Sequence, residues 1–404
     1  MSFFSDPVNS IILWLRNLLI GWGLSTGGVT LIMKALGVMV LSTLALLLVI
    51  FLIWLERKLA ARFQQRLGPN RVGPYGLIQP IADVIKIFTK EHITPFGVEG
   101  FLYNLAPILS VAAVLMLWAV IPLYKGVVGA DLNVGVLYLV AAGALGTLAI
   151  LLAGWSSNNK YALVGAFRTV AQMVSYEVPT VISLLVPVLL AGTMSVSGIV
   201  EQQKVIYLLV SPVAALLFFL SSLAEIGRTP FDLMEAESEI VAGFHIEYSG
   251  LKFGMFYVGE FLHAFTVSAL FAVLFLGGWR GWGAESFPLL GLVYFMLKSF
   301  LVYFLVVWVR STLPRVRIDQ MLNFNWKFLT PVGLILLVAT AVVQKVILIS
   351  GASYGVMVLS HLVVNVLILW VAFRIVETRE ARRPRRQPVA QPRPVARPPE
   401  VTQA

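Results

Sequence analysis

The sequence has no cysteine and very little histidine. Because none of the 404 residues is a cysteine, the chain can form no disulfide, bind no thiolate-held iron–sulfur cluster and supply no catalytic thiol. The few histidines lack the paired placement on helices that a bis-histidine haem needs; they are His92, His245, His263 and His361. We therefore expect neither an intrinsic redox cofactor nor a metal site in this chain.

Charge is also scarce, and apolar residues take its place. Charged residues make up 12% of the chain and apolar residues 59%, whereas soluble domains average about 25% and 45–50%. The mean hydropathy, +0.88, is strongly positive. This composition indicates a protein that lies mostly in lipid.

Apolar runs of about 20 residues, the length that crosses a hydrocarbon core, recur along the chain. Backbone polar groups in lipid must be satisfied internally, so these runs predict helices. We expect an all-α polytopic integral membrane protein with about nine transmembrane helices, an amphipathic surface helix and long cytoplasmic loops. The expected spans are 29–55, 104–124, 134–154, 169–190, 206–226, 262–278, 289–309, 330–350 and 355–374, and the run at 262–278 is the shortest.

The two ends of the chain differ from this core. Residues 8–24 carry Arg16 among apolar side chains and predict an interfacial helix rather than a span or a cleaved signal. We therefore divide the chain into an N-terminal interfacial segment (1–28), a transmembrane domain (29–376) and a disordered Arg/Pro-rich tail (377–404). Lys and Arg concentrate in the tail and in the loops after the odd-numbered spans. This bias places those parts in the cytoplasm and the N-terminus outside. From its basic residues we expect the tail to contact anionic lipid headgroups. We do not expect it to bind nucleic acid, because it is not a folded basic patch.

Four acids crowd the segment 230–243, at Asp232, Glu235, Glu237 and Glu239. Like charges this close repel, and in a low-dielectric setting some carboxylates hold protons near neutral pH, which suits proton handling. The alternative is a helix start, with Thr229 as N-cap, Pro230 as first residue and Asp232 near the positive helix end. Capping accounts for one acid only.

A second informative segment spans 76–91. Its apolar residues Ile81, Val84, Ile85 and Phe88 recur with helical spacing, opposite polar ones, and predict an amphipathic helix. It either lies along the membrane surface or covers the bundle. The turn-rich connector 68–76 precedes it.

These two segments resemble the signature segments of one family, the H subunit of bacterial proton-translocating NADH:quinone oxidoreductase (complex I), counterpart of a mitochondrial complex I subunit. Other stretches, spread over about residues 29 to 350, look like the same family's pattern: Glu56-Arg57-Lys58, Gly68-Pro69-Asn70, Ser175-Tyr176-Glu177, Ala224-Glu225, Glu247-Tyr248 and Leu313-Pro314-Arg315 with Arg317-Asp319-Gln320 nearby. Several multi-position matches carry far more weight than one short motif.

The resemblance implies that this chain carries no redox centre, and that FMN and iron–sulfur clusters sit only in partner subunits. Quinone is the implied substrate, and its tail would enter from lipid beside the first span and the amphipathic helix. The implied partners are the peripheral-arm subunits of the quinone site, the membrane-arm subunits and membrane lipids. The implied location is the bacterial cytoplasmic membrane.

The resemblance also assigns roles to individual residues. Quinone-binding residues would be three at the chamber mouth and four in the third cytoplasmic loop, namely Arg57, Lys58 and Arg62, then Arg228, Phe253, Phe256 and Tyr257. Basic residues can instead anchor the interface, aromatic residues can simply pack, and for Arg228 we favour pairing with a nearby acid.

A chain of carboxylates would couple quinone reduction to proton translocation. The implied members are Asp83, Glu177, Glu225, Asp232, Glu235, Glu237, Glu239, Glu247 and Glu260. Glu177 stands out without the resemblance, because it lies inside an expected span, where a carboxylate is costly, next to Pro179.

Two other classes of protein use similar parts. An autonomous secondary transporter could use the same carboxylates, but no internal repeat is evident. A related membrane subunit of an energy-converting hydrogenase is the closer rival, and the complete quinone-type loop segments oppose it.

Overall fold

The computed structural model describes residues 7–233, 240–285, 287–351 and 353–381, and these ranges confirm the all-α prediction, with one isolated bridge between Tyr124 and Val127. The elements are α1 (Pro7–Gly21), α2 (Thr26–Phe63), η1 (Pro74–Gly76), α3 (Gln79–Thr89), α4 (Gly100–Leu117), α5 (Gly135–Ser156), α6 (Lys160–Ala191), α7 (Val196–Gln202), α8 (Tyr207–Val210), α9 (Pro212–Ile226), η2 (Gly243–His245), α11 (Gly250–Phe275), α12 (Pro288–Thr312), α13 (Ile318–Phe324), η3 (Asn325–Leu329), α14 (Thr330–Ser350) and α15 (Tyr354–Ala381).

Within the described ranges, eight helices are long and apolar enough to cross a membrane. The expected span 206–226 is instead divided into the short α8 and the 15-residue α9. The break lies at Ser211, because Pro212 disfavours helical geometry in the residue before it and has no N–H to donate. α9 is about 22 Å long, shorter than a typical hydrocarbon core.

Some span limits also differ from the prediction. α11 begins at Gly250, twelve residues earlier than expected, because Lys252 and Glu260 lower the hydropathy of its first turns. It is nevertheless the most buried of the eight helices, with 83% of its apolar window inside the protein. α4 ends at Leu117, and Pro122 lies in the loop that follows. Composition alone therefore placed the central helix poorly.

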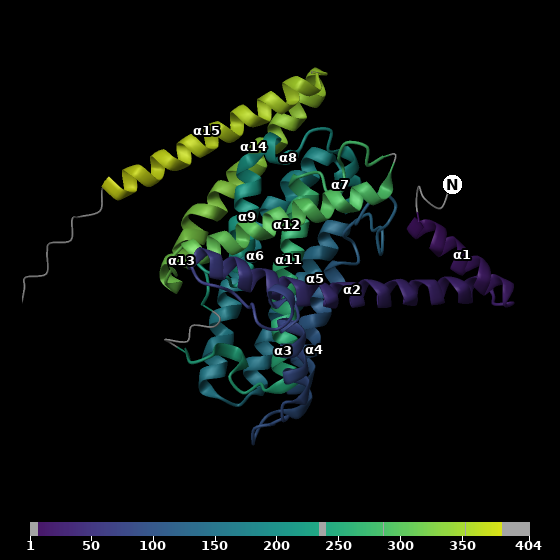
Figure 1. Ribbon diagram of the computed structural model, residues 1–404. Helices are drawn as coiled ribbons and strands as arrows, with labels where there is room; N and C mark the ends of the chain where they lie inside the picture. The colour runs from purple at the N-terminus through teal and green to yellow at the C-terminus, as the bar shows by residue number, and fades with distance from the viewer. Residues whose placement is uncertain (1–6, 234–239, 286, 352, 382–404) are drawn as a thin grey trace, which may run out of the picture.

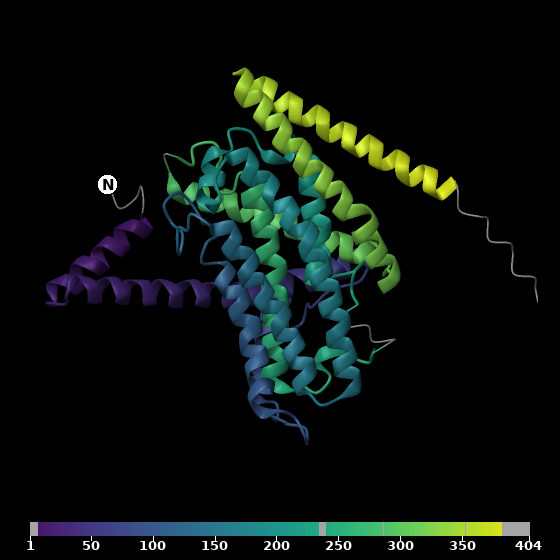
Figure 2. The same ribbon diagram turned by 180° about the vertical axis from the view of Figure 1, so that it is seen from behind.

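The helices form a bundle from which two arms extend. α4, α5, α6 and α11 run alongside one another, with α9, α12 and α14 packed against them (Figure 1). The N-terminal half of α2 leaves the bundle, with α1 folded back beside it, and α15 extends on the other side (Figure 2). With 38 residues, α2 is about 57 Å long, well beyond the thickness of a hydrocarbon core.

α3 lies at the rim of the bundle and presents its apolar stripe outward. Ile81, Ile85 and Phe88 are exposed, whereas Ile87 packs against α11 at Gly254. An apolar stripe that faces away from the bundle favours the membrane-surface alternative for this amphipathic helix over the bundle-covering one.

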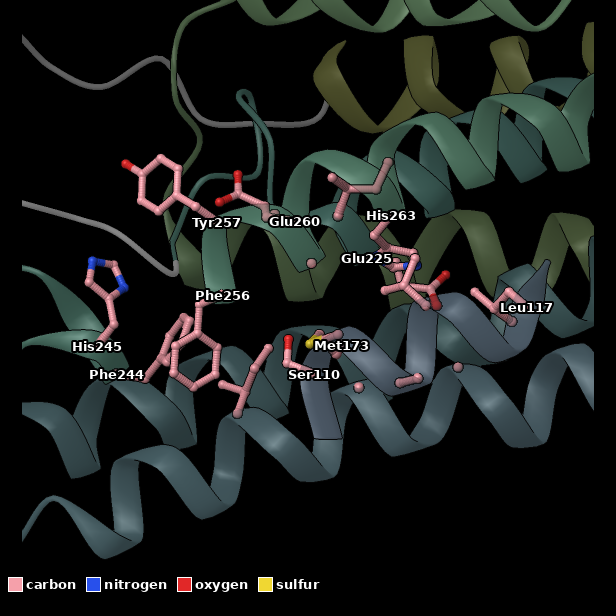
Figure 3. Close-up of a pocket in the computed structure, with 18 residues that line it drawn as sticks. Ser110, Leu117, Met173, Glu225, Phe244, His245, Phe256, Tyr257, Glu260 and His263 are labelled. Carbon is pink, nitrogen blue, oxygen red and sulfur yellow. The ribbon is translucent and has the colours of Figure 1, made fainter. Parts of the chain in front are cut away.

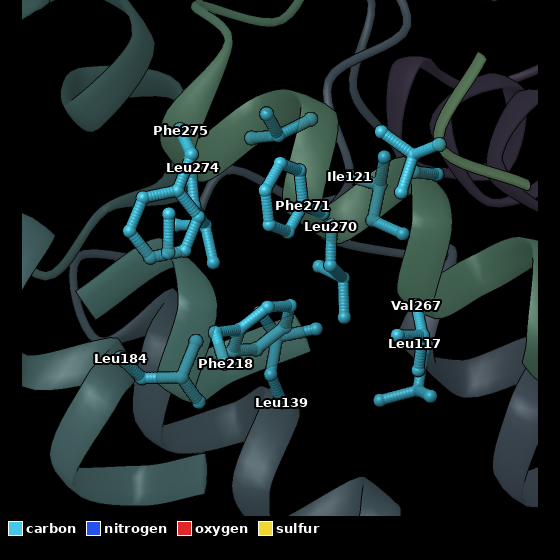
Figure 4. Close-up of a cluster of buried hydrophobic side chains, with 14 of the residues drawn as sticks. Leu117, Ile121, Leu139, Leu184, Phe218, Val267, Leu270, Phe271, Leu274 and Phe275 are labelled. Carbon is cyan, nitrogen blue, oxygen red and sulfur yellow. The ribbon is translucent and has the colours of Figure 1, made fainter. Parts of the chain in front are cut away.

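The hydrophobic core lies where α11 meets α9, α6 and α5. Phe218 of α9 packs against two rings of α11, with ring centroids 6.2 Å from Phe271 and 5.7 Å from Phe275 (Figure 4). Leu184 and Leu139 close the same cluster from α6 and α5 (Figure 4). Because α11 is surrounded by these helices, residues on its other turns are held in fixed positions.

α5 and α6 approach each other closely at a small residue. A Cβ added to Gly154 would lie 2.2 Å from the Cβ of Ala166 and 2.8 Å from the carbonyl oxygen of Ala162. Small residues of this kind allow helix backbones to approach closely in membranes.

We expect Gly154→Ala to destabilise the protein by about 1–3 kcal/mol, because overpacking forces α5 and α6 apart. Thermal unfolding of the detergent-solubilised protein measures the change. Gly146→Ala on the same helix is the control, since its nearest neighbour would be 4.0 Å away. Equal melting temperatures for the two variants would contradict the close approach at Gly154.

Candidate functional site

A cavity of about 70 Å³ lies between α4, α5, α6 and α11, where the end of α9 and the η2 turn close it. One end of the cavity is aromatic and is lined by Phe244, His245, Phe256 and Tyr257 (Figure 3). The other end holds Glu225 and His263 near Leu117. Glu260 lies between the two ends. A mostly apolar cavity with a few convergent polar groups is typical of a small-molecule site. We call it the central cavity.

Gly227 caps the end of α9, two residues after Glu225. It adopts the left-handed conformation, with φ +72°, and its N–H donates to the carbonyl of Ala224, which terminates the helix. Residues 227–233 that follow are not helical, and the Thr229–Pro230 peptide bond is cis. The helix start suggested at Thr229, Pro230 and Asp232 is therefore wrong, because the chain is still in a turn there.

A buried carboxylate, Glu56 at the inner end of α2, is the centre of an ion cluster. Arg228 Nη1 lies 3.0 Å from Glu56 Oε1, the Tyr303 hydroxyl donates to Glu56 Oε2 at 2.9 Å, and Arg310 forms a further ion pair with Glu56. Arg228 Nε also lies 3.2 Å from Glu260 Oε1. We call these five residues, Glu56, Arg228, Glu260, Tyr303 and Arg310, the Glu56 cluster.

The Glu56 cluster confirms that Arg228 pairs with acids. It contacts two carboxylates, and its guanidinium also lies over the Phe261 ring, 4.8 Å from the centroid. Glu260 belongs both to this cluster and to the lining of the central cavity. The cluster is therefore joined electrostatically to the cavity.

The structure brings some of the predicted acids together. Glu225 and Glu260 both line the central cavity. Glu177 in the middle of α6 is within electrostatic reach of Glu225 and accepts a hydrogen bond from Thr147 at 3.4 Å. Asp232 is within electrostatic reach of Glu260. These four carboxylates surround one region of the bundle.

Other predicted acids lie elsewhere. Asp83 on α3 forms an ion pair with Arg57 at 2.5 Å, and Glu247 accepts a hydrogen bond from Asn159 at 2.6 Å. Burial alone would raise the pKa of Asp83, but the hydrogen bond and charge of Arg57 lower it below its usual value. Glu235, Glu237 and Glu239 lie outside the described residues.

Proline at position 179 shapes α6 beside Glu177. Because Pro179 has no N–H, the carbonyl of Ser175, one turn earlier, has no partner within the helix. Asn325 Nδ2, in the π-helical turn η3, donates to that carbonyl at 2.5 Å. A proline inside a helix normally loosens the backbone, but here the amide of Asn325 replaces the missing hydrogen bond.

Arg228 belongs to the Glu56 cluster, and the other six predicted quinone residues fall into two groups. Phe256 and Tyr257 line the central cavity, and Phe253 packs against Tyr257 with ring centroids 4.8 Å apart. All three were expected in a cytoplasmic loop, which is wrong: α11 starts before them, at Gly250, so they lie on a helix.

The second group surrounds another pocket, of about 470 Å³, at the end of α2. Lys58 and Arg62 line it together with Trp54, Pro74, Tyr75 and Leu77, and we call it the rim pocket. Arg57 points toward α3 instead, because consecutive helical residues face about 100° apart. Gly76 allows the two ends of the connector to approach each other, since an added Cβ would lie 2.1 Å from the Pro69 carbonyl oxygen.

Sequence reasoning missed several residues of the site. Glu56 was noted only as part of a family pattern, and its partners Tyr303 and Arg310 were not singled out. His245 and His263 were considered only for haem, yet both line the central cavity. The sequence signal that could have identified these residues is a charged side chain or an imidazole within an apolar stretch. Within the described ranges, no group of three His, Asp or Glu residues could hold a metal ion.

Comparison with known proteins gives a consistent result. The family described as NADH dehydrogenase matches residues 36–341. The H subunit of NADH-quinone oxidoreductase from Dehalococcoides mccartyi strain CBDB1 is 51% identical, covering 72% of this chain and 82% of that protein. The H subunits of the same enzyme from Carboxydothermus hydrogenoformans (48%; 70% and 81% covered) and Phocaeicola vulgatus (45%; 77% and 90% covered) are also similar.

His245 gives a pH-dependent prediction. Burial beside Phe244 and Phe253 lowers its pKa from 6.5 to about 4. The imidazole is thus neutral in the folded protein, and its contribution to stability is complete above pH 6.5 and is lost as the pH falls toward 4. At pH 5 we expect a loss of about 2 kcal/mol, which His245→Asn avoids.

Thermal unfolding of the solubilised protein between pH 7 and pH 5 measures this difference. His92→Asn is the control, because His92 is exposed. A pH slope that is the same for the unsubstituted protein and for His245→Asn would contradict the burial argument.

Proposed function

The chain belongs to the NADH dehydrogenase family, as an H subunit of NADH-quinone oxidoreductase, and from this premise we propose that it helps to form the quinone chamber and couples quinone reduction to proton translocation through its carboxylates. The enzyme is the assembled complex, in which this chain is one of the membrane subunits. Family membership favours this function over the transporter and the hydrogenase subunit.

The central cavity is the observation that carries the proposal. Its aromatic end suits a flat quinone ring, since Phe256 and Tyr257 offer stacking and edge contacts. Glu260 connects it to the guanidinium of Arg228, and Asp232 is within electrostatic reach of the same Glu260 carboxylate. A quinone in this cavity that gains two electrons draws two protons to become a neutral quinol, and a proton taken from Glu225 or Glu260 leaves that carboxylate negatively charged.

The rim pocket supports a separate entry site. It lies at the end of α2, beside the connector that leads to α3, whose apolar stripe faces outward. Trp54 and Tyr75 offer rings to an isoprenoid tail, and Lys58 and Arg62 offer cations to a polar headgroup. We infer that quinone reaches the chamber past this pocket, and that Arg57 and Asp83 fix α3 to α2 beside it.

The coupling path that we propose runs through neighbouring carboxylates. Quinone reduction changes which of them hold protons, and the change passes from Asp232 and Glu260 to Glu225 and then to Glu177 inside α6. Partner subunits of the membrane arm would use this change to move protons. Glu235, Glu237, Glu239 and Glu247 stay proposed members of the same chain.

The same proposal includes the partner subunits of the chain and its location in the membrane. Peripheral-arm subunits would supply electrons from FMN and iron–sulfur clusters, since the cysteine-free chain has no thiolate for such a cluster. We place it in the bacterial cytoplasmic membrane, in contact with lipids, with the N-terminus outside and the basic tail (377–404) in the cytoplasm. The segment 1–28 would lie along the interface, ahead of the transmembrane domain 29–376.

The first test replaces Glu225 by Gln, which keeps the shape of the side chain and removes its proton exchange. We expect coupled NADH:quinone reductase activity in membrane vesicles to fall at least tenfold while the complex still assembles. Glu201→Gln is the control, because Glu201 is exposed on α7, away from the cavity. Normal turnover and normal proton uptake in Glu225→Gln would sink the coupling proposal.

The second test concerns the rim pocket. We expect Lys58→Gln combined with Arg62→Gln to raise the KM for quinone severalfold and to leave kcat nearly unchanged, because an entry site contributes binding and not chemistry. Arg66→Gln is the matched control, since Arg66 follows on the same basic stretch but does not line the pocket. A fall in kcat at constant KM would argue against an entry role.

A further inference from the structure

Gln172, in the middle of α6, is fully buried and holds two backbone carbonyls of another segment. Its Nε2 donates to the carbonyl of Ala224 at 2.6 Å and to the carbonyl of Phe231 at 2.7 Å. An amide nitrogen carries two N–H donors, so both bonds form at once. One side chain therefore fixes both ends of the stretch 224–231.

The stretch that Gln172 spans carries the charged groups of the site. Glu225, which lines the central cavity, follows Ala224 directly, and Arg228, which pairs with Glu56 and Glu260, lies between the two held carbonyls. This stretch contains the end of α9 and a turn, so helical hydrogen bonding alone does not fix its shape.

Tyr176, one turn further along α6, supports the same arrangement. Its ring lies 5.5 Å from that of Phe231, and its hydroxyl donates to the carbonyl of Met321 at 3.0 Å. The Tyr176 side chain is thus held at its far end, and the face of α6 that carries Gln172 is a rigid support for the turn.

We propose that Gln172 is a positioning residue for coupling, which holds Glu225 and Arg228 in a fixed relation across the turn 224–231. The proposal rests on the proposed function, because it requires that Glu225 takes part in coupling. Gln172 itself is assigned no contact with quinone. A shift of the turn would move the carboxylate and the guanidinium together, and would change the field that each imposes on the cavity.

The chain provides a close chemical control for Gln172. Gln203 is also buried, and its Nε2 donates to the carbonyls of Val273 and Leu274 at 3.0 and 2.9 Å. It holds the last turn of α11, and α8 and most of α9 separate it from Glu225 along the chain. A loss that follows merely from two unpaired buried carbonyls should therefore appear equally in both positions.

The experiment compares Gln172→Met with Gln203→Met in the assembled complex, in membrane vesicles. Met keeps the length of the side chain and removes both donors. We expect Gln172→Met to lower kcat for quinone reduction about tenfold and to lower the proton uptake per turnover, whereas Gln203→Met keeps both. Gln172→Glu is the second variant, since it keeps the shape and offers at most one donor.

A double-mutant cycle separates positioning from general stability. If Gln172 acts through Glu225, Gln172→Met combined with Glu225→Gln should be no slower than Glu225→Gln alone. Three results would each overturn the positioning role. The activity losses of Gln172→Met and Glu225→Gln could multiply in the double variant, or Gln172→Met and Gln203→Met could have equal effects. The third result is that neither Gln172 variant assembles. Failure of the proposed function is distinct, because Glu225→Gln itself would then be fully active.

Discussion

The buried carboxylate of Glu56 is the constraint on which the site depends. A carboxylate taken out of water is stable only if cations and hydrogen-bond donors replace the lost hydration, and breaking such a pair by removing one partner costs about 3–5 kcal/mol. Arg228, Arg310 and Tyr303 supply the replacements. They belong to the turn after α9 and to α12, so α2, α12 and this turn are tied at one point. Because Arg228 also contacts Glu260 on α11, the same charges set the boundary of the central cavity.

This arrangement places strong electrostatics next to an apolar space. The cavity walls come mainly from α4, α5 and α11, and the small Gly259 allows α11 to approach α4 at Ser110. An added Cβ at Gly143 would lie 3.7 Å from Glu225 Oε1, so α5 passes close to the carboxylate. In such a low-dielectric setting a change of one charge is felt by its neighbours far more strongly than in water. Close packing therefore makes the four neighbouring carboxylates, Glu177, Glu225, Asp232 and Glu260, interdependent.

The sequence was sufficient for features that depend on local composition. Apolar runs revealed the membrane fold, helical spacing revealed α3, and the placement of Glu177 in lipid marked it without any resemblance. It was insufficient where distant segments meet. Glu56 lies 172 residues from Arg228 and 247 from Tyr303, and only packing brings them together. The start of α11 was misplaced because Lys252 and Glu260 look unfavourable in a span until tertiary contacts are known, such as the ion pair of Glu260 with Arg228. Pro230 resembled a helix start because a proline is also common at the first position of a helix, whereas residues 227–233 form a turn here.

The bond from Asn325 to the carbonyl of Ser175 has a consequence for the order in which the chain is completed. The two residues are 150 positions apart, and a chain is synthesised from its N-terminus. When α6 enters the membrane, the carbonyl that Pro179 leaves open has no partner, because the residue that supplies it has not yet been made. The segment around Glu177 therefore reaches its final geometry late in biosynthesis, when η3 and α14 arrive against α6. A helix from the first half of the chain is finished by a residue from the last quarter.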